Sequence, residues 1–117
     1  MITHPRTEEL VEAVARWIDT LRPELKPRDA FLARVAVNVL GVVQRELTLG
    51  PAAEAAAIER MSELLGHVGG YEDLTAELCA KLRAGEMDAA TPGLLAALRA
   101  NAQDQAAIDQ PNYSSAR

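Results

Sequence analysis

The strongest constraint on the fold is an apolar pattern. Leu, Val, Ile and Ala recur at intervals of three and four residues in five segments of the chain. Such spacing places apolar side chains along one side of an α-helix. Aromatic residues, which favour strands, make up only 3% of the sequence. The pattern therefore predicts an all-α fold.

Pro and Gly residues separate these segments and predict where helices end. We expect five helices, which begin at Thr7, after a cap at Asp29, at Pro51, near Tyr71 and after a cap at Thr91. Gly50 is expected to end the second helix, and Gly85 the fourth. The "GHVGG" stretch at residues 66–70 lacks the Lys and Ser or Thr of a phosphate-binding P-loop, which favours a helix-ending loop.

Short connections between the segments favour antiparallel neighbours. We expect a compact bundle of four or five helices in a single domain of residues 1–117, with a core at about residues 7–110. The last residues, 111–117, are expected to form a loose tail. A chain of 117 residues is long enough for a modest core of its own.

The second segment is apolar over more than half of its circumference when its residues are placed about 100° apart. A helix with this pattern is usually buried on most sides. We therefore expect the helix of residues 34–47 to lie at the centre of the bundle and to be its most buried part. The neighbouring segments carry narrower apolar stripes, so we also expect a homodimer that supplies further cover.

One polar strip interrupts this segment and consists of Arg34, Asn38 and Arg45. Two guanidinium groups beside an amide are suited to bind a carboxylate or a phosphate. These three residues are therefore the candidate ligand-binding site. In the alternative interpretation, the strip pairs with acidic residues of another helix or subunit, because the chain contains 17 Asp and Glu residues.

Glu46 falls inside the apolar arc of the same segment. An ionised carboxylate in an apolar core is strongly destabilising unless it is paired. Asp109 projects on the inward side of the last segment, so we expect Glu46 and Asp109 to belong to a buried polar network. The candidate arginine partners of Glu46 are Arg16, Arg83 and Arg99. Such a network has either a structural role or a ligand-binding or catalytic one.

Charge and residue usage argue against several classes of function. A net charge of -5 gives no positive surface for nucleic acid or for anionic lipid. The uncharged runs are too short to span a membrane, and the first residues do not resemble a secretory signal, so a cytoplasmic protein is expected. Cys79 is the single cysteine, and the histidines, His4 and His67, lack the spacing of a helical metal site. We expect no metal and no cofactor, and we identify no catalytic residues.

Three stretches carry a resemblance to a known family: "FLARVAVNVLGVVQREL", "LTAELCAKLRAGEMD" and "AIDQPNYS". From about Leu10 to Tyr113, the chain resembles an uncharacterised family of small helical bacterial proteins that carries a domain-of-unknown-function label. Members are typically encoded beside aminoglycoside-phosphotransferase-like kinases and acyl-CoA dehydrogenases. The motif "IDQPNY" departs slightly from the family, where Asn or a similar residue is expected before Pro111.

The resemblance implies an accessory role in acyl-CoA or hydroxyacid catabolism, with a kinase-like enzyme or an acyl-CoA dehydrogenase as partner. The first functional hypothesis is therefore a non-enzymatic accessory or regulatory interaction protein. The alternative is a protein that binds a small acid or acyl-CoA through Arg34, Asn38 and Arg45. An enzyme in its own right is the weakest of the three hypotheses.

Overall fold

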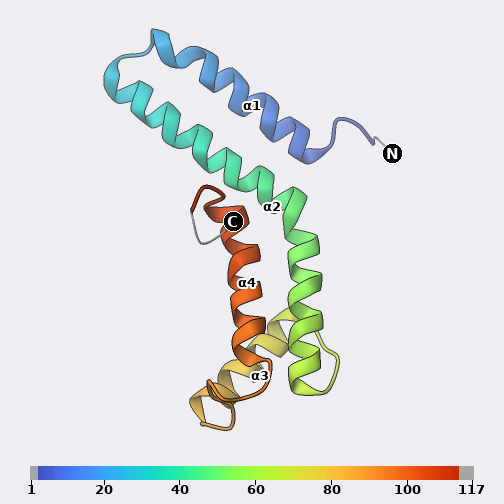
Figure 1. Cartoon of the computed structure of the whole chain (residues 1–117). Coiled ribbons are helices and arrows are strands. Elements are labelled where there is room, and N and C mark those ends of the chain that lie inside the picture. Colours follow the sequence, from blue (N-terminus) through green and yellow to red (C-terminus); the bar gives the residue numbers. More distant parts are fainter. Residues whose placement is uncertain (1–2, 114–117) are drawn as a thin grey trace. The chain divides into compact units, whose positions relative to one another are not determined.

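The structure is a computed structural model that describes residues 3–113. Within these residues it contains helices and no strand, which confirms the all-α fold (Figure 1). The elements are α1 (Thr7–Leu21), the short 3-10 helix η1 (Arg22–Glu24), α2 (Pro27–Leu65), α3 (Tyr71–Arg83) and α4 (Leu94–Asp109). Of the tail expected at 111–117, residues 114–117 lie outside the described part. None of the helices in residues 3–113 has both the length and the apolar character needed to cross a membrane.

Two glycines end helices where the sequence predicts it. Gly66 has φ +80° and follows α2, and its N–H donates to the carbonyl of Ser62 at 2.8 Å. Gly85 has φ +75° and follows α3, and the next N–H, of Glu86, donates to the carbonyl of Lys81 at 3.0 Å. A positive φ at the position after a helix is strained for any residue with a Cβ, which explains both glycines.

Two helix starts differ from the prediction. α2 begins at Pro27, so Asp29 lies in its first turn instead of capping it. Proline suits a first helical position because it has no N–H that needs a partner there. α4 begins at Leu94, after Gly93 with φ +82°, and not at Pro92 after a cap at Thr91. The Thr91 hydroxyl instead accepts a hydrogen bond from the Asp88 N–H at 3.0 Å, within the preceding turn.

The predicted helix break at Gly50 and Pro51 is wrong, because α2 continues through both residues. A proline inside a helix costs about 3 kcal/mol, and the alanine-rich residues that follow favour the helix strongly. The Gly-Pro pair nevertheless coincides with a division of the chain. Internal contacts group the residues into two units, Met1–Gly50 and Pro51–Arg117. The Gly-Pro signal therefore marks the boundary between two units and not the end of a helix.

The first unit is an antiparallel hairpin (Figure 1). Its two helices are α1 and the part of α2 that precedes Pro51, and η1 joins them. The Gln44 amide donates to the Glu12 carboxylate across the hairpin at 3.4 Å. Half-buried side chains at helical spacing mark the seam between the two helices; they include Val11, Ala15 and Ile18 on α1 and Ala33, Val37, Leu40 and Gln44 on α2.

No side chain of residues 3–50 is buried. The expectation that residues 34–47 form the most buried segment is therefore wrong. Val35 is 41% exposed and Val39 is 55% exposed, although both belong to the apolar arc of α2. Within this unit α1 is the one helix beside this part of α2, and one neighbour covers only one side of a helix.

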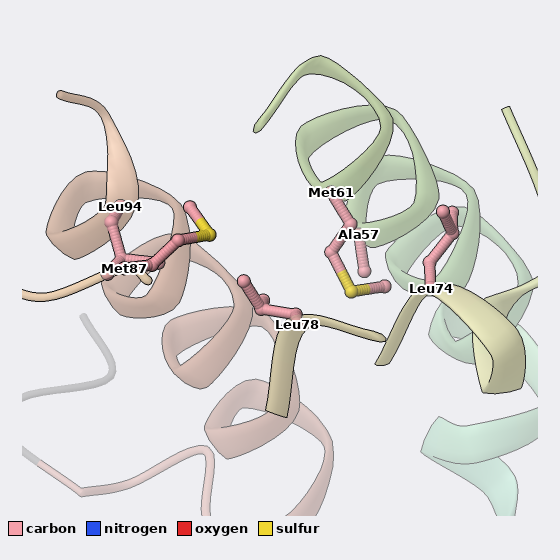
Figure 2. Packing of buried hydrophobic residues seen from close by; sticks show 6 residues of the cluster. All are labelled: Ala57, Met61, Leu74, Leu78, Met87 and Leu94. Atoms are coloured by element: carbon pink, nitrogen blue, oxygen red, sulfur yellow. The ribbon is translucent and has the colours of Figure 1, made fainter. Parts of the chain in front are cut away.

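The second unit contains the buried core of the described chain. Residues from the end of α2, from α3, from the following loop and from the start of α4 form one cluster: Ala57, Met61, Leu74, Leu78, Met87 and Leu94 (Figure 2). Leu74, Leu94 and Ile108 are the most deeply buried large side chains, each 1% exposed. Three helices and a loop contribute to this cluster. From α4 only Leu94 belongs to it, whereas Leu95 and Leu98 of the same apolar segment are exposed.

Candidate functional site

The predicted ligand strip lies on the polar side of α2 in the first unit. Arg34 and Asn38 are exposed, and Arg45 is half-buried. An Arg45 guanidinium nitrogen lies 3.2 Å from the place that a Cβ would take on Gly41, one turn earlier. The Arg45 side chain therefore folds back along α2 over Gly41, towards the turn that carries Asn38. The three residues share one helix face, and their binding role remains a prediction.

The two acids predicted to be buried are exposed, and this prediction is corrected. Glu46 belongs to the first unit, where its carboxylate oxygen lies 3.0 Å from the Cβ position of Gly50, one turn further along α2. Asp109 belongs to the second unit and accepts a hydrogen bond from the Gln105 amide at 3.1 Å. Arg16, one of the suggested partners of Glu46, pairs instead with Glu12 at 2.6 Å. The side of α2 that carries Glu46 is not covered by α1, so burial does not follow from its apolar neighbours.

The main unassigned feature of the first unit is an exposed apolar surface, here called the hairpin face. It comprises Leu10, Val14 and Trp17 of α1 and Leu32, Val35, Val39 and Val43 of α2. Their exposed fractions run from 40% for Val43 to 63% for Trp17. Trp17 is the single tryptophan of the chain. The helical spacing of apolar residues in the sequence predicts both stripes, and in the expected bundle they would point inwards.

The two stripes lie on the same side of the hairpin. On each helix, the exposed stripe is rotated by about 100–125° from the half-buried seam, at about 100° per residue. The rotation has the same sense about each helix axis. Because α1 and α2 are antiparallel, this rotation turns both apolar stripes to one side of the hairpin. The strip of Arg34, Asn38 and Arg45 is rotated from the seam in the opposite sense and therefore lies on the other side.

A polar contact that the sequence analysis missed joins α2 to α4 in the second unit. One Arg60 guanidinium nitrogen donates to the Asn101 amide oxygen and to an Asp104 carboxylate oxygen, each at 2.9 Å. Asn101 and Asp104 are three residues apart and therefore share one face of α4. Their spacing was the available signal, but sequence alone does not say which cation faces them.

A pocket of about 490 Å³ lies beside this contact. Its lining comes from α2, from the loop before α4 and from the start of α4: Arg60, Glu63, Leu64, Thr91, Pro92, Gly93, Ala96 and Ala97. The Arg60 charge is already balanced by Asp104. The pocket therefore lacks a strong feature for an acidic ligand, and we assign it no ligand.

His67 and Glu77 form the second polar contact of interest. The Nδ1 atom of His67 lies 3.1 Å from the Val68 carbonyl oxygen, and Nε2 lies 2.9 Å from both Glu77 oxygens. Both ring nitrogens face acceptors, so the Val68 carbonyl and then the Glu77 carboxylate raise the pKa of His67 above its usual value. Among residues 3–113, no three His, Cys, Asp or Glu side chains come together as a metal site would require.

Comparisons with known proteins place the chain in a family. No curated protein and no solved structure matches it. One family model does match, over residues 23–113, and its description is Domain of unknown function (DUF6285). The matched region begins in η1, includes α2, α3 and α4, and leaves α1 outside. This match covers well over half of the sequence and agrees with the resemblance seen in the motifs; the chain belongs to the DUF6285 family.

Proposed function

We propose that the protein is a non-enzymatic interaction protein that binds another protein chain through the hairpin face. The observation that carries this proposal is the contrast inside the first unit: residues 3–50 bury no side chain, yet seven large apolar side chains share one exposed side. Contiguous apolar surface of this size is uncommon on proteins that act alone, and it is typical of contact sites.

The extent of the hairpin face fits a protein partner. Seven large side chains with 40–63% exposure present on the order of 700 Å², close to the area that each partner buries in a standard interface. Trp17 lies at this surface, and tryptophan is one of the residues that contribute most to protein interfaces. The face extends along two helices, whereas a small-molecule site is concave and encloses its ligand.

The resemblance stated above supports a finer version of this proposal. In that version the protein is a cytoplasmic bacterial accessory or regulatory subunit in acyl-CoA or hydroxyacid catabolism. Its candidate partners are a kinase-like enzyme and an acyl-CoA dehydrogenase. The competing proposal is that Arg34, Asn38 and Arg45 bind an acid or acyl-CoA on the opposite side of the hairpin.

Co-purification tests the hairpin face directly. Three tagged full-length chains are used as bait in the cells of origin: wild type, Val39→Glu and Leu95→Glu. Mass spectrometry identifies the proteins that each chain retains. Val39→Glu places a carboxylate in the middle of the hairpin face, whereas Leu95→Glu is a matched control on α4, where Leu95 is 58% exposed. We expect wild type and Leu95→Glu to recover the same bound protein, and Val39→Glu to lose it. An untagged copy of this protein counts as such a bound protein.

Retention of the same proteins by all three chains would contradict the proposal. Recovery of an acyl-CoA dehydrogenase or a kinase-like enzyme that depends on Val39 would support the finer version. Substitution of Arg34 and Arg45 by Gln tests the competing proposal, since it should abolish binding of an acyl-CoA while leaving protein binding unchanged.

A further inference from the structure

We infer that the partner on the hairpin face is a second copy of this chain, docked so that the two α2 helices run antiparallel and Glu46 of each copy pairs with Arg28 of the other. This inference rests on the proposed function, since it names the partner of the same surface. It follows from the positions of the two charges relative to the apolar residues of α2.

Arg28 and Glu46 lie at the two ends of the exposed apolar stripe of α2. They are 18 residues apart, which is five whole helical turns, so both lie on the same line along the helix, about 27 Å from each other. Projected along the helix axis, this line falls between Val35 and Val39. Both charged side chains are exposed, and neither forms an ion pair with another residue of the described chain, 3–113. The stripe thus has a cation at one end and an anion at the other.

A two-fold axis at the level of residue 37, midway between these two charges, would give each of them an oppositely charged partner on the second copy. In an antiparallel pair of α2 helices, residues at equal distances before and after position 37 face each other. Arg28 then meets Glu46 of the second copy, and Val35 meets Val39. A parallel pair would instead oppose Arg28 to Arg28 and Glu46 to Glu46, and like charges in contact disfavour association.

The stripe on α1 is compatible with the same axis. The η1 connection and the Gln44–Glu12 contact place the middle of α1 beside the middle of the hairpin part of α2. The α1 stripe of Leu10, Val14 and Trp17 is centred on Val14. The same axis therefore places the α1 stripes of the two copies against each other, with Leu10 of one copy near Trp17 of the other. The two hairpins would form a four-helix arrangement whose interior is the pair of hairpin faces.

The arrangement also explains why an acid stands in an otherwise apolar arc. Glu46 fixes the direction and the register of docking, because a shift along the helix would separate both charge pairs. A single polar or charged residue within an apolar contact has this role in helical assemblies generally. Arg28 has the same role at the other end of the stripe.

Charge reversal in the full chain tests the inference. Arg28→Glu and Glu46→Arg are each expected to weaken self-association about tenfold or more, because each converts two attractive contacts per dimer into repulsive ones. An equimolar mixture of these two variants, and the variant that carries both changes, are expected to associate as wild type does. Arg99→Glu is the matched control, since it reverses a charge at an exposed position of α4, in the second unit.

Light scattering and sedimentation over a range of concentrations give the mass, and Trp17 fluorescence reports burial at the hairpin face. We expect the emission of Trp17 to shift to shorter wavelength as the dimer forms. Single variants that associate as tightly as wild type, or a mixture that fails to recover association, would overturn the antiparallel dimer. One outcome would overturn this inference alone: wild type is monomeric at high micromolar concentration, and Val39→Glu loses a protein partner other than a second copy. Failure of Val39→Glu to change any association would overturn the proposed function as well.

Discussion

The two units of the chain use the same kind of helix with opposite results. α1 separates its apolar and polar residues more sharply than the other three helices, yet it buries no side chain. In the second unit, weaker amphipathic patterns produce a core in which Leu74 and Leu94 are 1% exposed. The difference lies in the number of neighbours, because three helices can enclose a volume and two cannot. Amphipathic strength tells which side of a helix will be covered, but it does not tell whether the cover comes from the same chain.

The largest expected effect comes from the core of the second unit. Leu74→Ala should lower the free energy of unfolding by about 2–5 kcal/mol, since it opens a cavity at a fully enclosed site. Leu10→Ala removes the same atoms from a side chain that is 53% exposed, and in the dilute monomer should cost less than about 1 kcal/mol. Urea denaturation of both variants gives the two values. Equal losses at low protein concentration would show that the hairpin has a core of its own and would break the comparison.

The polar contact of the second unit should rank next. Arg60→Ala removes hydrogen bonds to Asn101 and Asp104, and should cost about 1–2 kcal/mol, because the three side chains are only partly exposed. Arg99→Ala, at an exposed position of α4, should change stability by less than about 0.5 kcal/mol. Thermal denaturation monitored by circular dichroism measures both. If the two variants melt together, the Arg60 contact does not hold α2 and α4 in place.

Glycine substitutions should differ in sign between the units. Gly85→Ala in the second unit should cost about 1 kcal/mol, because φ is +75° there. Gly41→Ala in the first unit should stabilise by about 0.5 kcal/mol, since Gly41 lies inside a helix and the new Cβ meets only the flexible end of Arg45. Chemical denaturation of each variant checks the signs. A destabilised Gly41→Ala would show that Arg45 needs its place over Gly41.

The smallest expected effect is the pH dependence of the loop contact in the second unit. The pKa of His67 is raised, so its pairing stabilises the folded chain fully below the ordinary pKa of 6.5. The stabilisation is lost as pH rises through the higher pKa of the folded state. Wild type should therefore lose more melting temperature than His67→Gln when the pH is raised from about 5.5 to 8.5. Identical pH profiles would show that the contact with Glu77 does not contribute to stability.

The sequence predicted the fold class because helix periodicity and helix-ending residues act locally. Gly66 and Gly85 end α2 and α3 as expected, since a positive φ depends on the residue itself. The break at Pro51 was wrong because the cost of one proline is smaller than the summed preference of its neighbours for a helix. The contacts of Arg60 with Asn101 and Asp104 were missed because they join residues about forty positions apart. No local pattern reports such a pairing.

The apolar sides of the helices, the polar strip of Arg34, Asn38 and Arg45, and the position of Glu46 within an apolar arc all follow from the sequence alone. They depend only on the rise and rotation per residue, which are the same in every α-helix. The tertiary structure alone decided which apolar sides are buried. It leaves the hairpin face open and Glu46 exposed, because burial depends on how many elements surround a helix, and that number is a property of the packed chain and not of any segment.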